Sequence, residues 1–161
     1  NGGSYRLFVK HFNGSVMTDA VVRAFNVETR MELDEPETYR AWFSSLQANR
    51  DKCVPFIRSA VAAGKSVWVY GASTKGNVIL QFYGLDHSLI TAAADRSPEK
   101  HGKYTVGTGI PIVSEEEFRK AQPEFALVLP YAFRNEFIER EAAWRENGGR
   151  FIFPLPNFKV V

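Results

Sequence analysis

The segment 71–77, Gly-Ala-Ser-Thr-Lys-Gly-Asn, carries the groups that a phosphate ligand needs. It follows an apolar run at 66–71 and precedes an apolar, helix-compatible segment at 77–84. A turn from a strand into a helix presents unpaired N–H groups and a partial positive charge, and both attract anions. Within the turn, two glycines permit a tight bend and a close backbone approach, Lys75 adds a charge, and Asn77 is expected to cap the helix.

This turn departs from the two best-known phosphate loops. It has G-x-x-x-x-G spacing, but Asn77 and Val78 stand where a Walker A loop has Lys and Ser or Thr. Ser73 replaces the second glycine of the dinucleotide fingerprint, which weighs against a bound NAD. Asp95 lies 24 residues after Gly71, close to the spacing of an acid that contacts a ribose hydroxyl. The alternative is that the glycines only serve a tight turn and that Asp95 caps the next one.

Two more polar segments follow expected strands. Residues 95–114 are polar, glycine-rich and basic, and they offer three side chains that could neutralise a diphosphate: Lys100, His101 and Lys103. Residues 130–136 offer two rings that could stack on a base and a guanidinium that could reach phosphate: Tyr131, Phe133 and Arg134. Each has a simpler reading, which is a solvated loop for the first segment and core packing for Phe133.

Composition excludes several other classes of function. The 161 residues include 20 basic and 18 acidic side chains without a basic run, so we expect no nucleic-acid partner. No apolar stretch reaches the roughly 20 residues of a membrane span, and the N-terminus has no signal-peptide pattern. Cys53 is the only cysteine, which excludes an internal disulfide and fits a reduced, cytoplasmic setting. It lies among apolar neighbours and is predicted to be a core residue. We find no Ser-His-Asp arrangement, no metal-ligand spacing and no acid/base pair of carboxylates.

The order of apolar runs predicts an α/β protein with a Rossmann-like, three-layer fold and a mostly parallel sheet. Expected strands are 5–10, 66–71, 89–95, 110–113, 125–130 and 150–156. Expected helices are one from Pro36 that Pro55 kinks or divides, and those at 77–84, 114–121 and 135–147. Residues 11–35 show little periodicity. We therefore expect an N-terminal strand and helical arm at 1–64 packed on a core at 65–161, together forming one compact domain.

Four blocks of the sequence resemble a known family. GASTKGNVILQ, AADRSPEKHGKYTVGTGIPI, FALVLPYAFRNEFIERE and GGRFIFPLPNFKVV occur in that order, and the opening GGSYRLFV also fits. Together they resemble the C-terminal domain of the sugar C-methyltransferases, which methylate a carbon of nucleotide-linked keto-deoxysugars with S-adenosylmethionine. Tyr131 stands where the family more often has Trp, but an aromatic side chain is kept.

The resemblance implies a three-part enzyme with a zinc-binding N-terminal domain, a central methyltransferase domain and this Rossmann-like domain. S-adenosylmethionine, zinc and the catalytic residues would belong to the upstream parts, and this chain would contribute no cofactor, metal or catalytic residue. Its implied role is to hold a nucleotide-linked sugar, of the thymidine diphosphate type, against the methyltransferase domain. The candidate substrate-binding residues are Gly71, Ala72, Ser73, Thr74, Lys75, Gly76, Asn77, Asp95, Lys100, Pro130 and Tyr131.

Other functions fit the same residues. A free-standing module that binds CoA or NAD(P) would use the same glycine turn and Asp95. The chain is also similar, more weakly and in its expected fold alone, to the nucleotide-sugar-binding domains of sugar acyltransferases. An interaction module would use Tyr39, Trp42 and Phe43 as a docking stripe, although these rings are also suited to packing the helical arm on the sheet.

Overall fold

The computed structural model describes residues 6, 8, 9, 11, 14 and 17–161. The chain divides into two compact units, an N-terminal unit at Asn1–Ser45 and a C-terminal unit at Leu46–Val161, and each is described by itself. The organisation into 1–64 and 65–161 stays a prediction. Of the strand expected at 5–10, three residues are described and have no regular secondary structure, while residues 5, 7 and 10 lie outside the described residues.

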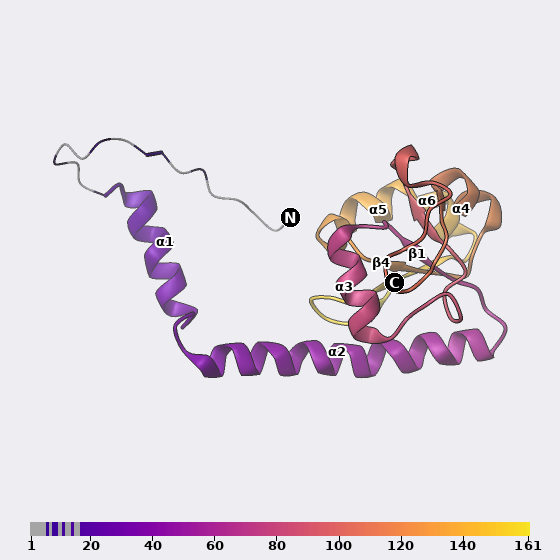
Figure 1. The fold of residues 1–161 in the computed structure, drawn as a ribbon, viewed down its shortest axis with the longest axis horizontal. Coiled ribbons are helices and arrows are strands. Elements are labelled where there is room, and N and C mark those ends of the chain that lie inside the picture. The colour runs from indigo at the N-terminus through magenta and orange to yellow at the C-terminus, as the bar shows by residue number, and fades with distance from the viewer. Residues whose placement is uncertain (1–5, 7, 10, 12–13, 15–16) are drawn as a thin grey trace. The chain divides into compact units, whose positions relative to one another are not determined.

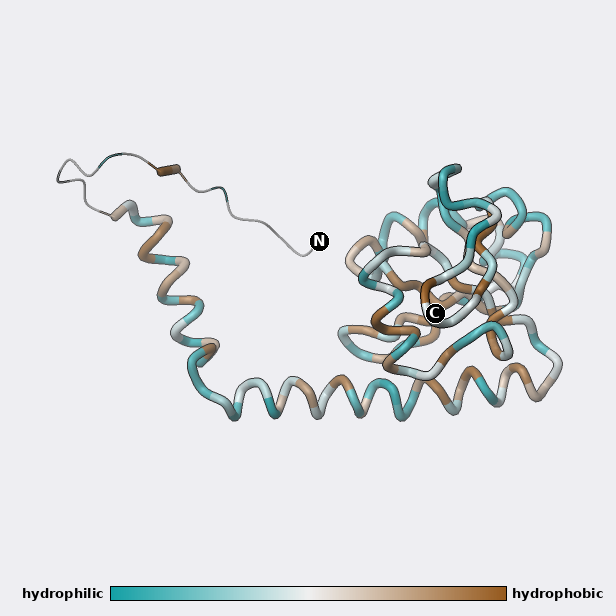
Figure 2. Tube along the Cα trace, in the orientation of Figure 1, coloured by the Kyte–Doolittle hydropathy of each residue, from teal (hydrophilic) through white to brown (hydrophobic). Residues whose placement is uncertain are grey.

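The N-terminal unit contains a helix that the sequence pattern did not predict, α1 (Asp19–Arg30). Asp19 in its first turn and Arg30 in its last turn both complement the helix dipole. None of its residues is buried, and Phe25 is 57% exposed. Apolar and polar positions alternate along the helix (Figure 2). Val21, Val22 and Phe25 fall on one side of this helix, a helical spacing that the sequence interpretation of residues 11–35 overlooked.

One continuous helix, α2 (Pro36–Ala62), runs through Pro55. Cys53, predicted to be a core residue, is buried together with Ile57 and Ala60, as expected for the core-facing side of a helix. Three aromatic rings nearer its start are exposed in the structure: Tyr39, Trp42 and Phe43. Among the residues that the structure describes, no helix has the length and apolarity to cross a membrane.

The C-terminal unit, which carries the labels β1 and β4 in Figure 1, is built on a sheet. Its strand order is β3-β2-β1-β4-β5-β6. The strands are β1 (Val67–Tyr70), β2 (Ala93–Asp95), β3 (Ile112–Ser114), β4 (Phe125–Val128), β5 (Arg150–Phe153) and β6 (Lys159–Val160). All neighbours are parallel except β5 and β6. Because β2 and β4 flank β1, the strand order reverses at β1, and its carboxyl end is where a sheet of this kind binds ligands.

The short antiparallel strand β6 was not predicted. Phe151 and Val161 exchange backbone hydrogen bonds of 2.8 and 2.9 Å. The Asn49 amide of α2 holds the turn before β6, since its Nδ2 donates to the Pro156 carbonyl and its Oδ1 accepts from the Phe158 N–H, each at 2.8 Å. The tail is therefore fixed to both the sheet and α2.

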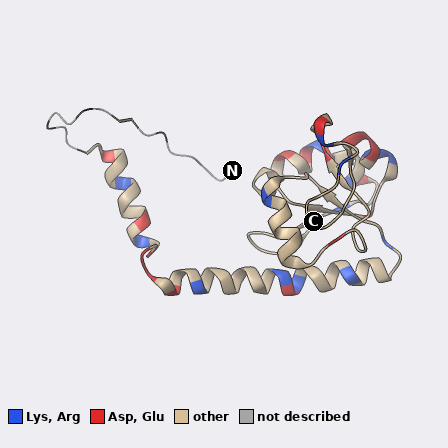
Figure 3. Ribbon diagram, in the orientation of Figure 1, with Lys and Arg blue, Asp and Glu red and all other residues tan. Residues whose placement is uncertain are grey.

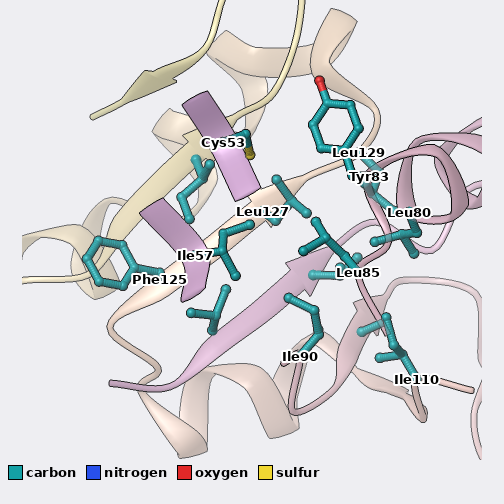
Figure 4. Packing of buried hydrophobic residues seen from close by; sticks show 14 of the residues in the cluster. Cys53, Ile57, Leu80, Tyr83, Leu85, Ile90, Ile110, Phe125, Leu127 and Leu129 are labelled. Carbon is teal, nitrogen blue, oxygen red and sulfur yellow. The ribbon is translucent and has the colours of Figure 1, made fainter. Parts of the chain in front are cut away.

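Helices cover both faces of the sheet, which confirms the three-layer Rossmann-like fold. The helical elements after α2 are α3 (Thr74–Tyr83), η1 (Pro98–Lys100), α4 (Glu115–Ala121), η2 (Tyr131–Phe133), α5 (Arg134–Arg140) and α6 (Ala142–Glu146). On one face, Ile57 of α2 and Leu80 of α3 pack with Leu127 of β4 (Figure 4). On the other face, Phe118 and Trp144 pack with side chains of β1, β4 and β5.

The single helix predicted at 135–147 is divided into α5 and α6 at Glu141. The backbone of Glu141 leaves the helical region, with φ of −105° and ψ of 31°. Its side chain is 2% exposed and accepts a hydrogen bond of 2.6 Å from the Tyr70 hydroxyl. The break therefore accompanies a carboxylate that turns into the protein, which helix periodicity does not reveal.

Candidate functional site

Ser73 begins α3 at the turn after β1. Its extended backbone (φ −84°, ψ 152°) and its Oγ, which accepts from the Gly76 N–H at 3.0 Å, make it the N-cap. The prediction that Asn77 caps this helix is wrong, because the helix starts three residues earlier. Asn77 lies in the first turn instead. Its side-chain Oδ1 is buried and has no hydrogen-bond partner among the described residues.

The first turn of α3 keeps several donors uncommitted. The N–H groups of Thr74 and Lys75 donate to no described residue, and both residues are exposed. The Lys75 ammonium forms no ion pair with the described part of the chain. This end of the helix therefore has the unpaired amides and the charge that attract an anion.

The two glycines of the turn are required by packing. Gly71 has a φ of +87°, and a Cβ there would lie 2.6 Å from ring carbons of Pro130. A Cβ on Gly76 would lie 2.5 Å from Leu129 Cδ1 and 2.9 Å from Ser73 Oγ. The sequence interpretation of a tight turn is right for Gly71. For Gly76, the close neighbour in this structure is the segment that follows β4.

We expect Gly76→Ala to lower the free energy of unfolding by about 2 kcal/mol, since the added methyl group overpacks a buried contact with Leu129. Gly84→Ala is the control, because a Cβ there meets nothing within 4 Å and only the positive φ of 62° opposes it. Urea unfolding of both variants measures the difference. A Gly76→Ala variant as stable as the unaltered chain would show that the methyl group at residue 76 is accommodated.

Asp95 and Lys100 join the turn after β2 to the turn after β1. The Lys100 ammonium lies 2.9 Å from Asp95 Oδ2 and donates to the Ala72 carbonyl at 3.0 Å. The other carboxylate oxygen of Asp95 accepts from the Ser97 N–H at 2.9 Å. His101 Nε2 lies 2.8 Å from the Asp95 carbonyl. These contacts fix the two turns side by side, as the parallel sheet predicted.

A cleft of about 390 Å³ lies where β1, β2 and β4 end, on the face that α4 and α5 cover. Its lining combines an aromatic and prolyl part with a charged part. The lining residues are Tyr70, Gly71, Asp95, Arg96, Ser97, Glu115, Pro130, Phe133, Glu136, Phe137 and Arg140. A volume of this size is in the usual range for small-molecule sites.

Ion pairs hold the α4–α5 wall of the cleft. Arg140 reaches Glu115 at 3.0 Å and Glu136 at 3.2 Å, and Glu115 also pairs with Arg119 at 3.2 Å. Behind this wall, the buried Glu141 accepts from Arg119 Nε at 2.9 Å and from Tyr70. Burial, together with the neighbouring Glu141 carboxylate, raises the pKa of Tyr70 well above its usual value. Tyr70 therefore stays a neutral donor. Charged side chains of both signs are interspersed over these helices (Figure 3).

The predicted residues are only partly brought together. Gly71, Asp95 and Pro130 line the cleft, and Lys100 is joined to it through Asp95. The exposed first turn of α3 and Tyr131 are not part of the lining. Sequence reasoning missed four charged lining residues: Arg96, Glu115, Glu136 and Arg140. Arg96, Glu115 and Glu136 each lie next to the end of an expected strand or helix, whereas Arg140 lies in the middle of the helix expected at 135–147 and has no such signal.

Comparison with known proteins identifies the family. The profile of the C-methyltransferase C-terminal domain matches residues 1–156. The C-methyltransferase NovU of Streptomyces niveus is 37% identical over 123 residues, which are 76% of this chain and 29% of NovU. The match therefore spans less than a third of that relative's length. The resemblance noted from the four sequence blocks is confirmed, and the chain belongs to the C-methyltransferase C-terminal domain family.

Proposed function

We propose that this domain holds a nucleotide-linked sugar, of the thymidine diphosphate keto-deoxysugar type, for a methyltransferase domain elsewhere in a longer enzyme. The observation that carries this proposal is that Gly71 lines the cleft and also leads into the α3 turn with its uncommitted amides, on the edge where the strand order reverses. A diphosphate at the turn would leave the rest of a nucleotide sugar within reach of the cleft. The family membership and the relative's name, C-methyltransferase, support this role.

The family's cofactors belong to the other parts of the proposed enzyme. S-adenosylmethionine would supply the methyl group there, and this domain would bind and orient the acceptor. The chain's own residues do not fit zinc, because Cys53 is fully buried among apolar side chains and burial raises the pKa of its thiol to about 12. Within the described residues, no group of three His, Cys, Asp or Glu side chains is placed to hold a metal. A reduced, cytoplasmic setting is part of the proposal.

Binding of CoA or NAD(P) is less well supported. The Rossmann-like strand order and Asp95 at the end of β2 are the features that such a ligand would use. However, the Asp95 carboxylate already bonds Lys100 and the Ser97 N–H, so a ribose would have to share it. NADH and CoA therefore serve as competing ligands in the test below.

Lys75→Gln is expected to weaken the binding of a thymidine diphosphate sugar to this chain about fivefold, because it removes an uncommitted charge at the turn. Lys52→Gln, on the exposed side of α2, is the matched control and should leave the affinity unchanged. Calorimetry measures the affinity, and amide NMR shifts locate the ligand. We expect the shifts at residues 71–77 and 95–103.

Two results would overturn the proposed function. One is the absence of binding at millimolar nucleotide sugar, with the amide spectrum unchanged. The other is tighter binding of NADH or CoA than of the nucleotide sugar, which would favour the alternative ligand class.

A further inference from the structure

The cleft lining includes a cation, Arg96, that the described part of the chain leaves unpaired. Arg96 is exposed in the lining and forms no ion pair with any described residue. The other two cations nearby are committed, because Arg140 pairs with two glutamates and Lys100 pairs with Asp95. Arg96 is therefore the lining residue with a free guanidinium for an anionic group of a ligand.

The cleft also presents an aromatic face. Phe133 lines it and is 44% exposed, and its ring centroid lies 6.3 Å from that of the buried Phe137. Phe137 in turn packs edge-on against Tyr70 at 5.3 Å. Phe133 therefore packs on one side against a ring that is itself held in the core. A fixed ring with one open side is suited to stacking against a planar ligand.

A fixed acceptor lies in the same segment of the chain. Glu136 Oε1 accepts from Arg140, while its second carboxylate oxygen has no described partner. By contrast, both oxygens of Glu115 are engaged by arginines. Glu136 can therefore accept a hydrogen bond from a ring N–H or a hydroxyl while Arg140 holds its carboxylate in place.

We propose that this cleft binds the nucleoside of the nucleotide sugar, with the base stacked on Phe133, a base N–H or ribose hydroxyl bonded to Glu136, and Arg96 on the phosphates. The inference rests on the proposed function and adds to it which part of the ligand enters the cleft and which residues select it. Gly71 lines the cleft as well, so phosphates that leave it pass directly to the turn before α3.

The test compares two probes on this chain, thymidine diphosphate and inorganic pyrophosphate, by calorimetry. Phe133→Leu is expected to weaken thymidine diphosphate about tenfold and to leave pyrophosphate unchanged, since stacking is lost and charge is kept. Arg96→Gln is expected to weaken both probes. The controls are Tyr104→Leu and Lys52→Gln, an exposed ring and an exposed charge that do not line the cleft.

The outcomes separate this inference from the proposed function. If the nucleotide sugar binds with shifts at 71–77 but both cleft variants match their controls, the cleft assignment is wrong and the proposed function stands. If Phe133→Leu weakens the nucleotide sugar but not thymidine diphosphate, the sugar occupies the cleft and the assignment is also wrong. If no nucleotide or nucleotide sugar binds the unaltered chain, both fail. Arg96 is exposed, so its variant reports on binding even if Phe133→Leu disturbs the fold.

Discussion

Replacing Glu141 with alanine is expected to lower the free energy of unfolding by about 3 kcal/mol. The carboxylate is buried and accepts hydrogen bonds from Tyr70 and Arg119, so its removal leaves the Tyr70 hydroxyl without a partner inside the protein. Arg119 is partly exposed and can turn to water, which limits the loss. The same change removes the contact of Glu141 with Arg119 of α4, which helps to hold the α4–α5 wall. We therefore also expect weaker ligand binding in the cleft.

Chemical denaturation of Glu141→Ala checks this value. Glu139→Ala, an exposed glutamate of α5, is the matched control and should change stability by less than about 0.5 kcal/mol. Glu141→Gln keeps an acceptor for Tyr70 but loses the charge opposite Arg119. Its loss of free energy of unfolding should therefore fall between those of Glu141→Ala and Glu139→Ala. If Glu141→Ala were as stable as the Glu139 control, Glu141 would not anchor the wall.

Raising the pH from about 8 to about 11 is expected to lower the free energy of unfolding by roughly 5 kcal/mol. Burial raises the pKa of Cys53 from 9.0 to about 12 and that of Tyr83 from 10.0 to about 12. It raises the pKa of Tyr70 by more than that of Tyr83. Above pH 9 the unfolded chain loses these protons while the folded chain keeps them. The folded state then binds more protons than the unfolded state. The contribution of these groups to the free energy of unfolding is therefore fully present below pH 9, and it is lost as the pH rises toward the folded pKa values.

Urea unfolding at a series of pH values measures this decline. Tyr83→Phe removes one of the three groups while keeping the ring, and it should reduce the loss at pH 11 by about 1 kcal/mol. Tyr104→Phe is the control, because that ring is 67% exposed and the variant should follow the unaltered chain. A constant free energy of unfolding up to pH 11 would contradict the claim that burial raises the pKa values of these three groups.

The parts of the fold that local pattern controls were predictable. Each core strand from β1 to β5 falls within or overlaps an apolar run, because strands covered on both faces have no polar side. The capping box of α4 was also visible, and the structure confirms it: Ser114 Oγ accepts from the Glu117 N–H at 3.1 Å while the Glu117 carboxylate bonds back to Ser114.

The parts that long-range contacts decide were not predictable. Asn77 and Ser73 are both good capping residues, and backbone geometry selected Ser73. The lining of the cleft joins Arg96 to Arg140 across 44 positions of sequence, and nothing local marks Glu136 as a neighbour of either turn. That Lys100 neutralises a ligand stays a prediction, but no local pattern indicated that its ammonium joins two turns through Asp95 and the Ala72 carbonyl.

The antiparallel strand β6 also protects the border of the sheet. An unpaired outer strand offers a row of free N–H and C=O groups, on which a foreign strand can add and start aggregation. Here β6 already occupies those groups of β5, it is only two residues long, and it carries Lys159, a charge that discourages further strand addition. Since Asn49 anchors the turn that leads into it, an incoming chain at this side would have to displace a tethered segment.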